Sequence, residues 1–186
     1  MANGPYPSFL RINLLSLTMK TLFLLLISMA TGSLVLHAQN TKVDRPVYTF
    51  SYPSEWKMDT DDPDYDPDSY FAIDIDENNL MLFFIMDQVD MQEIVDAQQD
   101  ALTRAVMENP EKISQFKKWG AYTGVGKMMR GSLPGTTAAT IRIFAHNFKD
   151  KTLLVILQCH DADLEKIGKG LKLVEESFML KQSERG

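Results

Sequence analysis

The segment Leu80–Met86 constrains the fold more than any other part of this sequence, because every one of its residues is apolar. A strand with one face in water alternates apolar and polar side chains, whereas a strand covered on both faces is apolar throughout. Leu80–Met86 is therefore predicted to be a central strand of a sheet that is covered on both faces. Tyr70–Ile75 is its predicted neighbour, because the turn Asp76–Asn79 contains asparagines, which tolerate the left-handed conformation of tight turns.

Two amphipathic helices are predicted to supply the covering layers. Apolar residues recur at three- and four-residue steps in Asp90–Asn109 and in Asp161–Leu180, which predicts one apolar stripe on each helix. Asp90 and Glu93 fit a capping pair at the start of the first helix. Gly168 and Gly170 in the second helix cost about 1 kcal/mol each relative to alanine. A close approach of this helix to the sheet is the expected compensation.

Further strands are predicted before and after the first helix. Val47–Tyr52 carries aromatic residues at alternate positions, which indicates one buried face, and Pro53 ends this strand because proline cannot donate to a sheet ladder. Glu111–Tyr122 is predicted to be a short turn followed by a strand that ends near Tyr122, and Gly124–Ser132 is predicted to be the next strand.

The clearest hairpin joins Thr136–Asn147 to Lys151–His160, with Phe148–Asp150 as its predicted loop. Opposing residues in a hairpin share a face, so the loop length decides which side chains meet. This register places Ile141 opposite Leu157, Ile143 opposite Val155 and Ala145 opposite Leu153, on one face with Cys159. The other face then carries Arg142, Phe144, His146, Gln158 and His160, together with Thr140, Leu154 and Ile156.

These elements predict an α+β fold in which an antiparallel sheet of about six strands is flanked by helices. One domain is expected over residues 47–180, after a polar lead-in at 39–46 and before a frayed tail at 181–186. Residues 1–38 are predicted to be a secretory signal peptide. Leu22–Leu36 is a run of 15 residues without a charge, shorter than the roughly 20 needed to span a membrane, and Ala38 is the small residue expected at the cleavage site.

Two further points concern the leader. Met19 begins a complete signal by itself, so residues 1–18 are interpreted as an over-called start. An uncleaved membrane anchor is the alternative to cleavage. The predicted localisation is periplasmic or secreted, with no membrane span after the leader is removed.

The charge of the chain disfavours two classes of partner. The formal net charge is −6, and loss of the leader would remove Arg11 and Lys20 and make it more negative. Non-specific binding to nucleic acid or to anionic lipid depends on positive charge, so neither partner is expected. The single cysteine, Cys159, excludes an internal disulfide and is predicted to be a small buried apolar side chain.

An acidic loop is predicted at Asp59–Ser69, which contains six aspartates and two prolines. The spacing does not fit an EF-hand loop, because Pro67 stands where that loop requires glycine and Ile73 where it requires glutamate. A solvated loop is the favoured interpretation, without a cofactor. A weak calcium site is the alternative, and its candidate ligands are Asp61, Asp62, Asp64, Asp66 and Asp68.

No catalytic motif is present, whether a nucleophile elbow, a Walker loop, HExxH or CxxC. Cys159 and His160 are adjacent in a strand and point to opposite faces, which argues against a nucleophile pair. The remaining candidate is the mixed face around Phe144, on which Arg142, His146, Gln158 and His160 can hydrogen-bond to a partner or ligand.

Two short motifs and the order of the elements resemble the PsbP-like family. The motifs are Phe50–Trp56, which reads FSYPSEW, and Glu176–Phe178 in the closing helix. The likeness covers nearly all of the predicted domain, from Val47 to Leu180. It implies an α/β/α sandwich, no enzymatic activity and recognition of another protein or assembly. Relatives include a photosystem accessory subunit linked to calcium and manganese retention, whose ion-binding residues match no positions here, so that role is not carried over.

The function predicted from these observations is that of an exported, non-catalytic accessory protein that recognises a partner protein in the cell envelope. A protein that binds a small ligand or a divalent cation, through the acidic loop or the Arg142 face, is the alternative. A hydrolase with dispersed catalytic residues is the third hypothesis.

Overall fold

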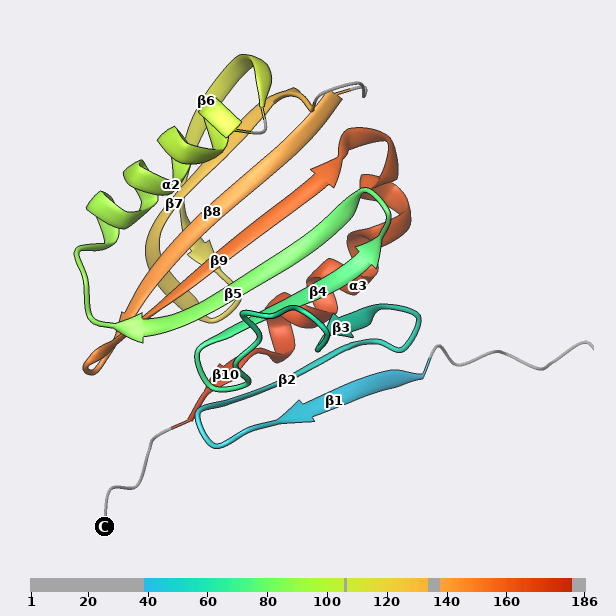
Figure 1. The fold of residues 1–186 in the computed structure, drawn as a ribbon, viewed down its shortest axis with the longest axis vertical. Helices are drawn as coiled ribbons and strands as arrows, with labels where there is room; N and C mark the ends of the chain where they lie inside the picture. Colours follow the sequence, from blue (N-terminus) through green and yellow to red (C-terminus); the bar gives the residue numbers. More distant parts are fainter. Residues whose placement is uncertain (1–38, 106, 134–137, 182–186) are drawn as a thin grey trace, which may run out of the picture. The chain divides into compact units, whose positions relative to one another are not determined.

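The computed structural model describes residues 39–105, 107–133 and 138–181, and within them the chain forms two antiparallel sheets and two α-helices (Figure 1). The predicted leader, residues 1–38, lies outside the described residues. The small sheet has the order β1-β2-β10 and the main sheet the order β3-β4-β5-β9-β8-β7-β6. The elements are β1 Asn40–Asp44, β2 Tyr48–Pro53, β3 Lys57–Asp59, β4 Tyr70–Asp76, β5 Asn79–Asp87, α2 Met91–Ala105, β6 Glu108–Trp119, β7 Tyr122–Ser132, β8 Ala138–Phe148, β9 Lys151–His160, the 3₁₀ helix η1 Asp161–Asp163, α3 Leu164–Ser177 and β10 Met179–Leu180.

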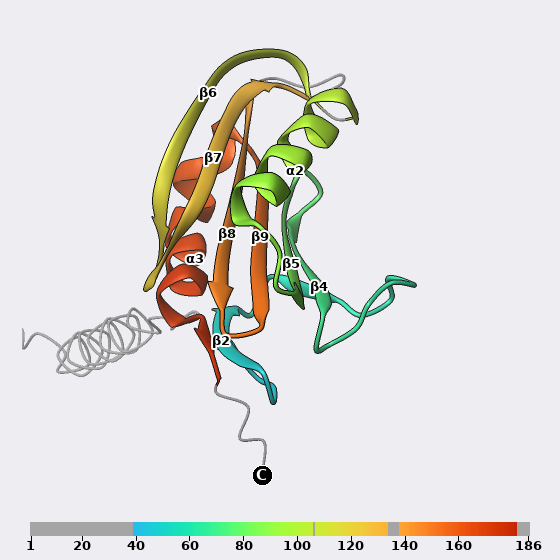
Figure 2. The ribbon, with the colours of Figure 1, turned by 90° about the vertical axis from the view of Figure 1, so that its left-hand side faces the viewer.

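The main sheet lies between α3 on one face and α2 on the other (Figure 2). The small sheet packs beside α3, and α2 packs mainly on β7 and β8. Two apolar clusters follow from this layering. One joins the small sheet, α3 and one face of the main sheet, and the other joins α2 to the opposite face. The predicted α+β fold with an antiparallel sheet is confirmed, although the described residues form ten strands rather than about six.

Strand β5 lies between β4 and β9, as its apolar sequence predicts. Met81, Phe83 and Ile85 are buried on the α3 face. Their neighbours Leu82, Phe84 and Met86 point to the α2 face, where they are only half-buried. The two faces of β5 are therefore covered unequally.

The hairpin of β8 and β9 forms, but its predicted register is wrong by one residue. Phe148 pairs with Lys151, so the loop is the two-residue turn Lys149-Asp150. Lys149 has φ 56°, in the left-handed region that such short hairpin turns use. A slip of one residue moves every side chain of a strand to the other face. Ile141 consequently faces Gln158, Ile143 faces Ile156 and Ala145 faces Leu154.

Both helices are shorter than predicted, because strands begin at their ends. Helix α2 ends at Ala105, and β6 begins at Glu108 instead of after a turn at Glu111. The predicted cap is present, since the backbone N–H of Glu93 donates to Oδ1 of Asp90 at 2.9 Å. Helix α3 ends at Ser177, and Met179–Leu180 leaves the helix to pair with β2.

The opening strand forms in the small sheet rather than in the main one. Its side chains Tyr48 and Phe50 are buried in an aromatic stack with Phe71, Phe83 and Phe178, with ring centroids between 4.6 and 5.9 Å apart. The segment 39–46, predicted to be a polar lead-in, contains β1, which pairs with β2. The sequence of β1 has no alternating apolar pattern that would predict a strand, because Val43 is its one buried side chain.

Candidate functional site

The five residues predicted to share one mixed face lie on opposite faces of the main sheet. Because of the register, Arg142, Phe144 and His146 point to the α3 face, and Gln158 and His160 point to the α2 face. The predicted common surface around Phe144 is therefore wrong. Phe144 is itself only 1% exposed and belongs to the core.

The ring of His146 has structural partners, and His160 is held through its backbone. Nδ1 of His146 lies 2.9 Å from the carbonyl oxygen of Thr123, and its ring packs on Tyr122 with centroids 4.8 Å apart. The backbone N–H of His160 donates to Oδ1 of Asn79 at 2.8 Å. Since the two rings lie on different faces of the sheet, they cannot act on one substrate or hold one metal ion together.

Cys159 is fully buried, as predicted. Burial raises the pKa of its thiol to about 11, and the negative charge of Asp161 adds to the rise. A thiol with a raised pKa is a poor nucleophile at neutral pH. The chemistry of a thiolate is therefore not available at this position in the folded protein.

The acidic loop uses its carboxylates to bind its own backbone. Oδ1 atoms of Asp59, Asp62 and Asp66 each accept the N–H of the residue two positions on, at 3.1, 2.8 and 3.0 Å. These bonds are Asx turns, which stabilise loops without any ion. Among the described residues, no three His, Cys, Asp or Glu side chains are placed together to hold a metal ion.

A large apolar surface lies where α2 does not reach. A helix with its side chains is about 10 Å wide and neighbouring strands are about 4.8 Å apart, so one helix covers about two strands. Helix α2 packs mainly on β7 and β8. On the same face, Leu82, Phe84 and Met86 of β5 meet only the border of the α2 cluster and stay half-buried. We call this surface the open sheet face. Its half-buried apolar side chains are Tyr70, Leu80, Leu82, Phe84 and Met86, and Ala72 is buried between them.

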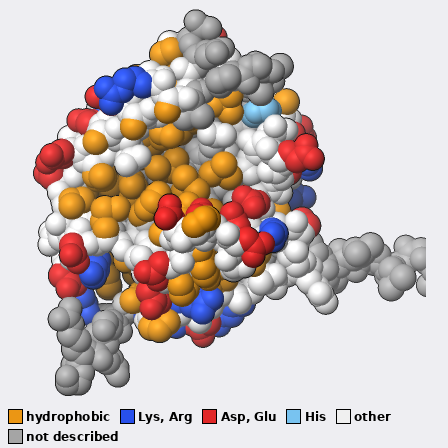
Figure 3. Space-filling view, viewed as in Figure 1, with side chains coloured by type: hydrophobic (Ala, Val, Ile, Leu, Met, Phe, Trp, Pro, Cys, Tyr) orange, Lys and Arg blue, Asp and Glu red, His pale blue; other side chains and the backbone are white. Residues whose placement is uncertain are grey.

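Figure 3 shows that apolar side chains gather over this face of the molecule and that acidic side chains border them. Tyr70 and Phe84 pack against each other on β4 and β5, with ring centroids 4.9 Å apart. The hydroxyl of Tyr70 donates to Oδ2 of Asp62 at 3.0 Å, which ties the acidic loop to the open sheet face. Burial and this carboxylate raise the pKa of Tyr70 to about 12, so the hydroxyl remains a donor at neutral pH.

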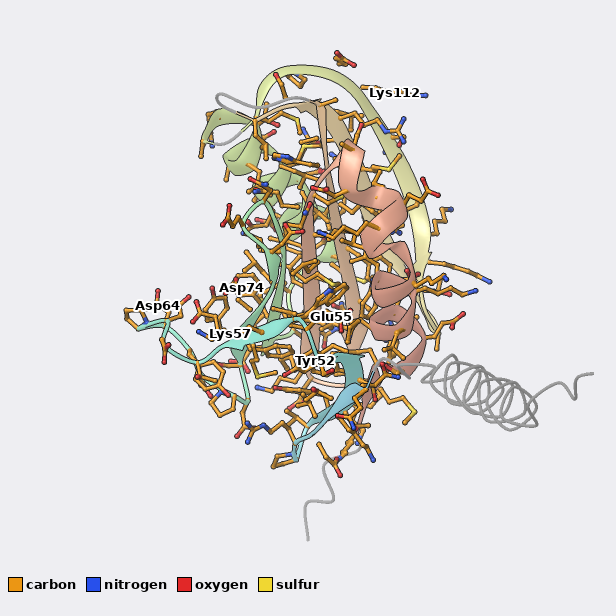
Figure 4. The ribbon with its side chains drawn as sticks, turned by 90° about the vertical axis from the view of Figure 1, so that its right-hand side faces the viewer. Tyr52, Glu55, Lys57, Asp64, Asp74 and Lys112 are labelled. Atoms are coloured by element: carbon orange, nitrogen blue, oxygen red, sulfur yellow. The ribbon has the colours of Figure 1, made fainter. Side chains whose placement is uncertain are left out.

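The border of the open sheet face is mostly negative. Asp74 continues the face on β4, and Lys57 and Asp59 on β3 project from the same side. In Figure 4, Lys57, Asp74 and Asp64 lie on the side of the sheet that carries α2. Burial raises the pKa of Asp74, the negative charge of Asp59 raises it further, and the positive charge of Lys57 opposes the shift.

The sequence does not predict the open sheet face, because a strand that is apolar throughout indicates cover on both faces. The signal that could have found it is the number of helices. Two helices, one on each face, cannot cover both faces of a sheet of six strands or more.

The arrangement defines a class of α+β protein, an antiparallel sheet between two helices with a small sheet beside one of them. No protein-family model and no curated protein sequence matches the chain. Its fold is similar to the solution structure of cyanobacterial PsbP (CyanoP) from Synechocystis sp. PCC 6803, at 14% identity and a TM-score of 0.51, over 81% of this chain and 96% of that one.

Two crystal structures are also similar. One is a protein from Bacteroides thetaiotaomicron VPI-5482, at 12% identity and a TM-score of 0.50, over 77% of this chain and 49% of that one. The other is the Saccharomyces cerevisiae Ran-binding protein Mog1p, at 12% identity and a TM-score of 0.49, over 77% of this chain and 96% of that one. The likeness to CyanoP confirms the predicted PsbP-like fold. No helix in the described part of the chain is long and apolar enough to cross a membrane.

Proposed function

We propose that this protein is an exported, non-catalytic accessory protein that binds a partner protein of the cell envelope through the open sheet face. The observation that carries the proposal is the apolar row on β5, which α2 covers only in part and which stays half-buried. Contiguous exposed apolar surface is typical of interaction sites, because its removal from water drives association. The charge-free run Leu22–Leu36 supports export.

The charges around the open sheet face favour a particular partner. Asp59, Asp74 and the acidic loop border the apolar row, and Lys57 is the cation among them. Complementary charges at the rim of an interface steer encounter and exclude wrong partners. The partner is therefore expected to present an apolar segment flanked by lysine or arginine.

A photocrosslinking residue in place of Phe84 tests this proposal. The matched control is the same residue in place of Ile113 on β6, which is 46% exposed and lies outside the open sheet face. In an envelope extract, we expect one partner to crosslink saturably from position 84 and not from position 113. Asp74→Lys should lower the yield, because it reverses a charge at the border.

Three outcomes would contradict the proposal. Equal labelling from both positions would mean non-specific contact, and no labelling would mean that no partner docks there. Crosslinked dimers of this chain would assign the face to self-association.

A further inference from the structure

A groove on the opposite face of the main sheet is lined by α3, by β8 and by the turn between β6 and β7. Its volume is about 630 Å³, which lies in the range typical of small-ligand sites. We call it the Arg142 groove. It is lined by Gly120, Ala121, Arg142, Leu164, Gly168, Leu171, Lys172, Glu175 and Glu176.

The charged side chains of this groove are paired, with one exception. Nζ of Lys172 lies 3.6 Å from Oε1 of Glu176, and Oε1 of Glu175 accepts the N–H of Gly120 at 2.9 Å. The guanidinium of Arg142 makes no ion pair or hydrogen bond to any described residue. Its five N–H donors therefore lack a protein acceptor.

The guanidinium is nevertheless held in place. It packs over the ring of Phe116, 5.0 Å from the centroid, and Phe116 in turn stacks on Phe144 at 6.0 Å. The Phe116 side chain lies across β7 at Gly126, where an added Cβ would be 2.6 Å from the Phe116 ring. No fully buried side-chain nitrogen in the described residues lacks a partner, so the guanidinium is reachable from the groove.

A second groove offers a comparison, because one of its cations is paired with a carboxylate. It lies between Trp56 and the other side of α3 and has a volume of about 470 Å³. There Nζ of Lys166 is paired with Oδ2 of Asp76 at 3.4 Å. The Arg142 groove differs because its unpaired cation is held in place over the ring of Phe116.

Space beside Arg142 is open on the α3 side. A Cβ added at Gly168 would meet no atom within 4 Å, and the half-buried Leu164 and Leu171 flank this position. A ligand can therefore place an apolar body against α3 while an acidic group reaches the guanidinium.

We infer that the Arg142 groove binds an organic monocarboxylate with a short apolar body, either a free acid or the C-terminus of a peptide. A guanidinium accepts a carboxylate through two parallel hydrogen bonds, which fixes both position and orientation. A ligand with a single negative charge fits, because the groove has one unpaired cation. The nearby carboxylate of Glu175 would repel a second negative charge on the ligand. This site lies on the opposite face from the open sheet face and does not depend on the proposed function.

The test uses 3-phenylpropionate and its amide, and the tripeptide Ala-Leu-Phe with a free or an amidated C-terminus. Binding is measured by calorimetry and by the NMR signal of the Arg142 Nε–H. Both acids should bind saturably, and each amide should bind at least about tenfold more weakly. Binding by one acid only identifies the source of the carboxylate and supports the same site.

Three variants separate the site from a general charge effect. Arg142→Gln and Gly168→Leu should each weaken binding by about tenfold or more, the first by removing the donors and the second by filling the groove. The control Lys172→Gln removes a cation that is already paired and should change binding less than about threefold. Gly168→Leu adds its side chain in open space, so it keeps the test valid if Arg142→Gln does not fold.

Several results would overturn the inference. Acids and amides that bind equally would remove the role of the carboxylate. Absence of saturable binding at millimolar concentrations of both acids would remove the site. A loss with Lys172→Gln as large as that with Arg142→Gln would reduce the effect to net charge.

Discussion

Among single residues, Gly170 shows most directly how α3 meets the rest of the domain. An added Cβ would lie 2.4 Å from Cζ2 of Trp56 and 2.8 Å from Cγ of Pro53. Glycine at this position therefore lets α3 pack closely on the corner after β2, as its helix-breaking cost led us to expect. Gly168 carries no such constraint, and the expectation of a close approach at Gly168 is wrong.

The first prediction compares these two glycines. Gly170→Ala should lower the free energy of unfolding by about 1–3 kcal/mol, because an overpacked side chain forces Trp56 or the helix to move. Gly168→Ala is the matched control and should raise it by about 1 kcal/mol through helix propensity. Urea denaturation of the three proteins measures both changes. Equal destabilisation by both variants would contradict the packing argument.

The second prediction concerns Asp74 on the open sheet face. Its pKa is raised by burial and by Asp59, so the folded state holds the proton more tightly than the unfolded chain does. The contribution of Asp74 to the stability of the fold is therefore greatest at low pH. It falls as the pH rises from about 4, the ordinary pKa of an aspartate, through the raised pKa of Asp74 in the folded state. Asp74→Asn should consequently raise the melting temperature at pH 7 and have no effect at pH 3. A gain that is the same at both pH values would mean that the charge is not its cause.

At the scale of elements, the sequence patterns identify strands and helices better than they identify which face each side chain occupies. The periodic patterns predict β5, α2 and α3, because burial of one stripe or of both faces leaves a regular signature. The β8–β9 register depends instead on one turn residue. Nothing in the side chain of Lys149 favours a positive φ, so the sequence predicts a three-residue loop. That loop wrongly assigns His160 and Arg142 to the same face, whereas the two-residue turn puts them on opposite faces.

The candidate site was less predictable than the fold for a related reason. The open sheet face depends on how much of the sheet α2 covers. The Arg142 groove depends on the contacts of Arg142 with residues that are distant in the sequence. The Phe116 ring reaches Arg142 across β7 only because Gly126 has no side chain. Neither relation leaves a periodic signal in the sequence.

The third prediction concerns the acidic loop as an element. Its carboxylates already accept backbone N–H groups in Asx turns, and its Asp66 also accepts the hydroxyl of Ser69 at 2.6 Å. We therefore expect millimolar calcium to leave the melting temperature unchanged relative to the same ionic strength of sodium chloride. Calorimetry with a chelator as reference measures this. A saturable shift that Asp62→Asn abolishes would establish a cation site.

At the scale of the whole molecule, Phe178 joins the two sheets. Its ring centroid lies 5.7 Å from that of Phe50 in the small sheet, and 5.5 and 5.4 Å from those of Phe83 and Trp119 in the main sheet. The side chain is 1% exposed and follows directly after α3. Packing of one ring against both sheets couples their unfolding, because neither sheet can lose it without exposing the core of the other.

The last prediction follows from this coupling. The two tryptophans report separate regions, since Trp56 packs on α3 near the small sheet and Trp119 belongs to β6. Each of the variants Trp56→Phe and Trp119→Phe keeps one tryptophan. For each variant, the urea midpoint from the fluorescence of that tryptophan should equal the midpoint from circular dichroism.

Phe178→Ala should lower the free energy of unfolding by about 3–5 kcal/mol, because it opens a cavity between the sheets. Separate midpoints for the two regions before Phe178 is changed would show that the small sheet unfolds independently.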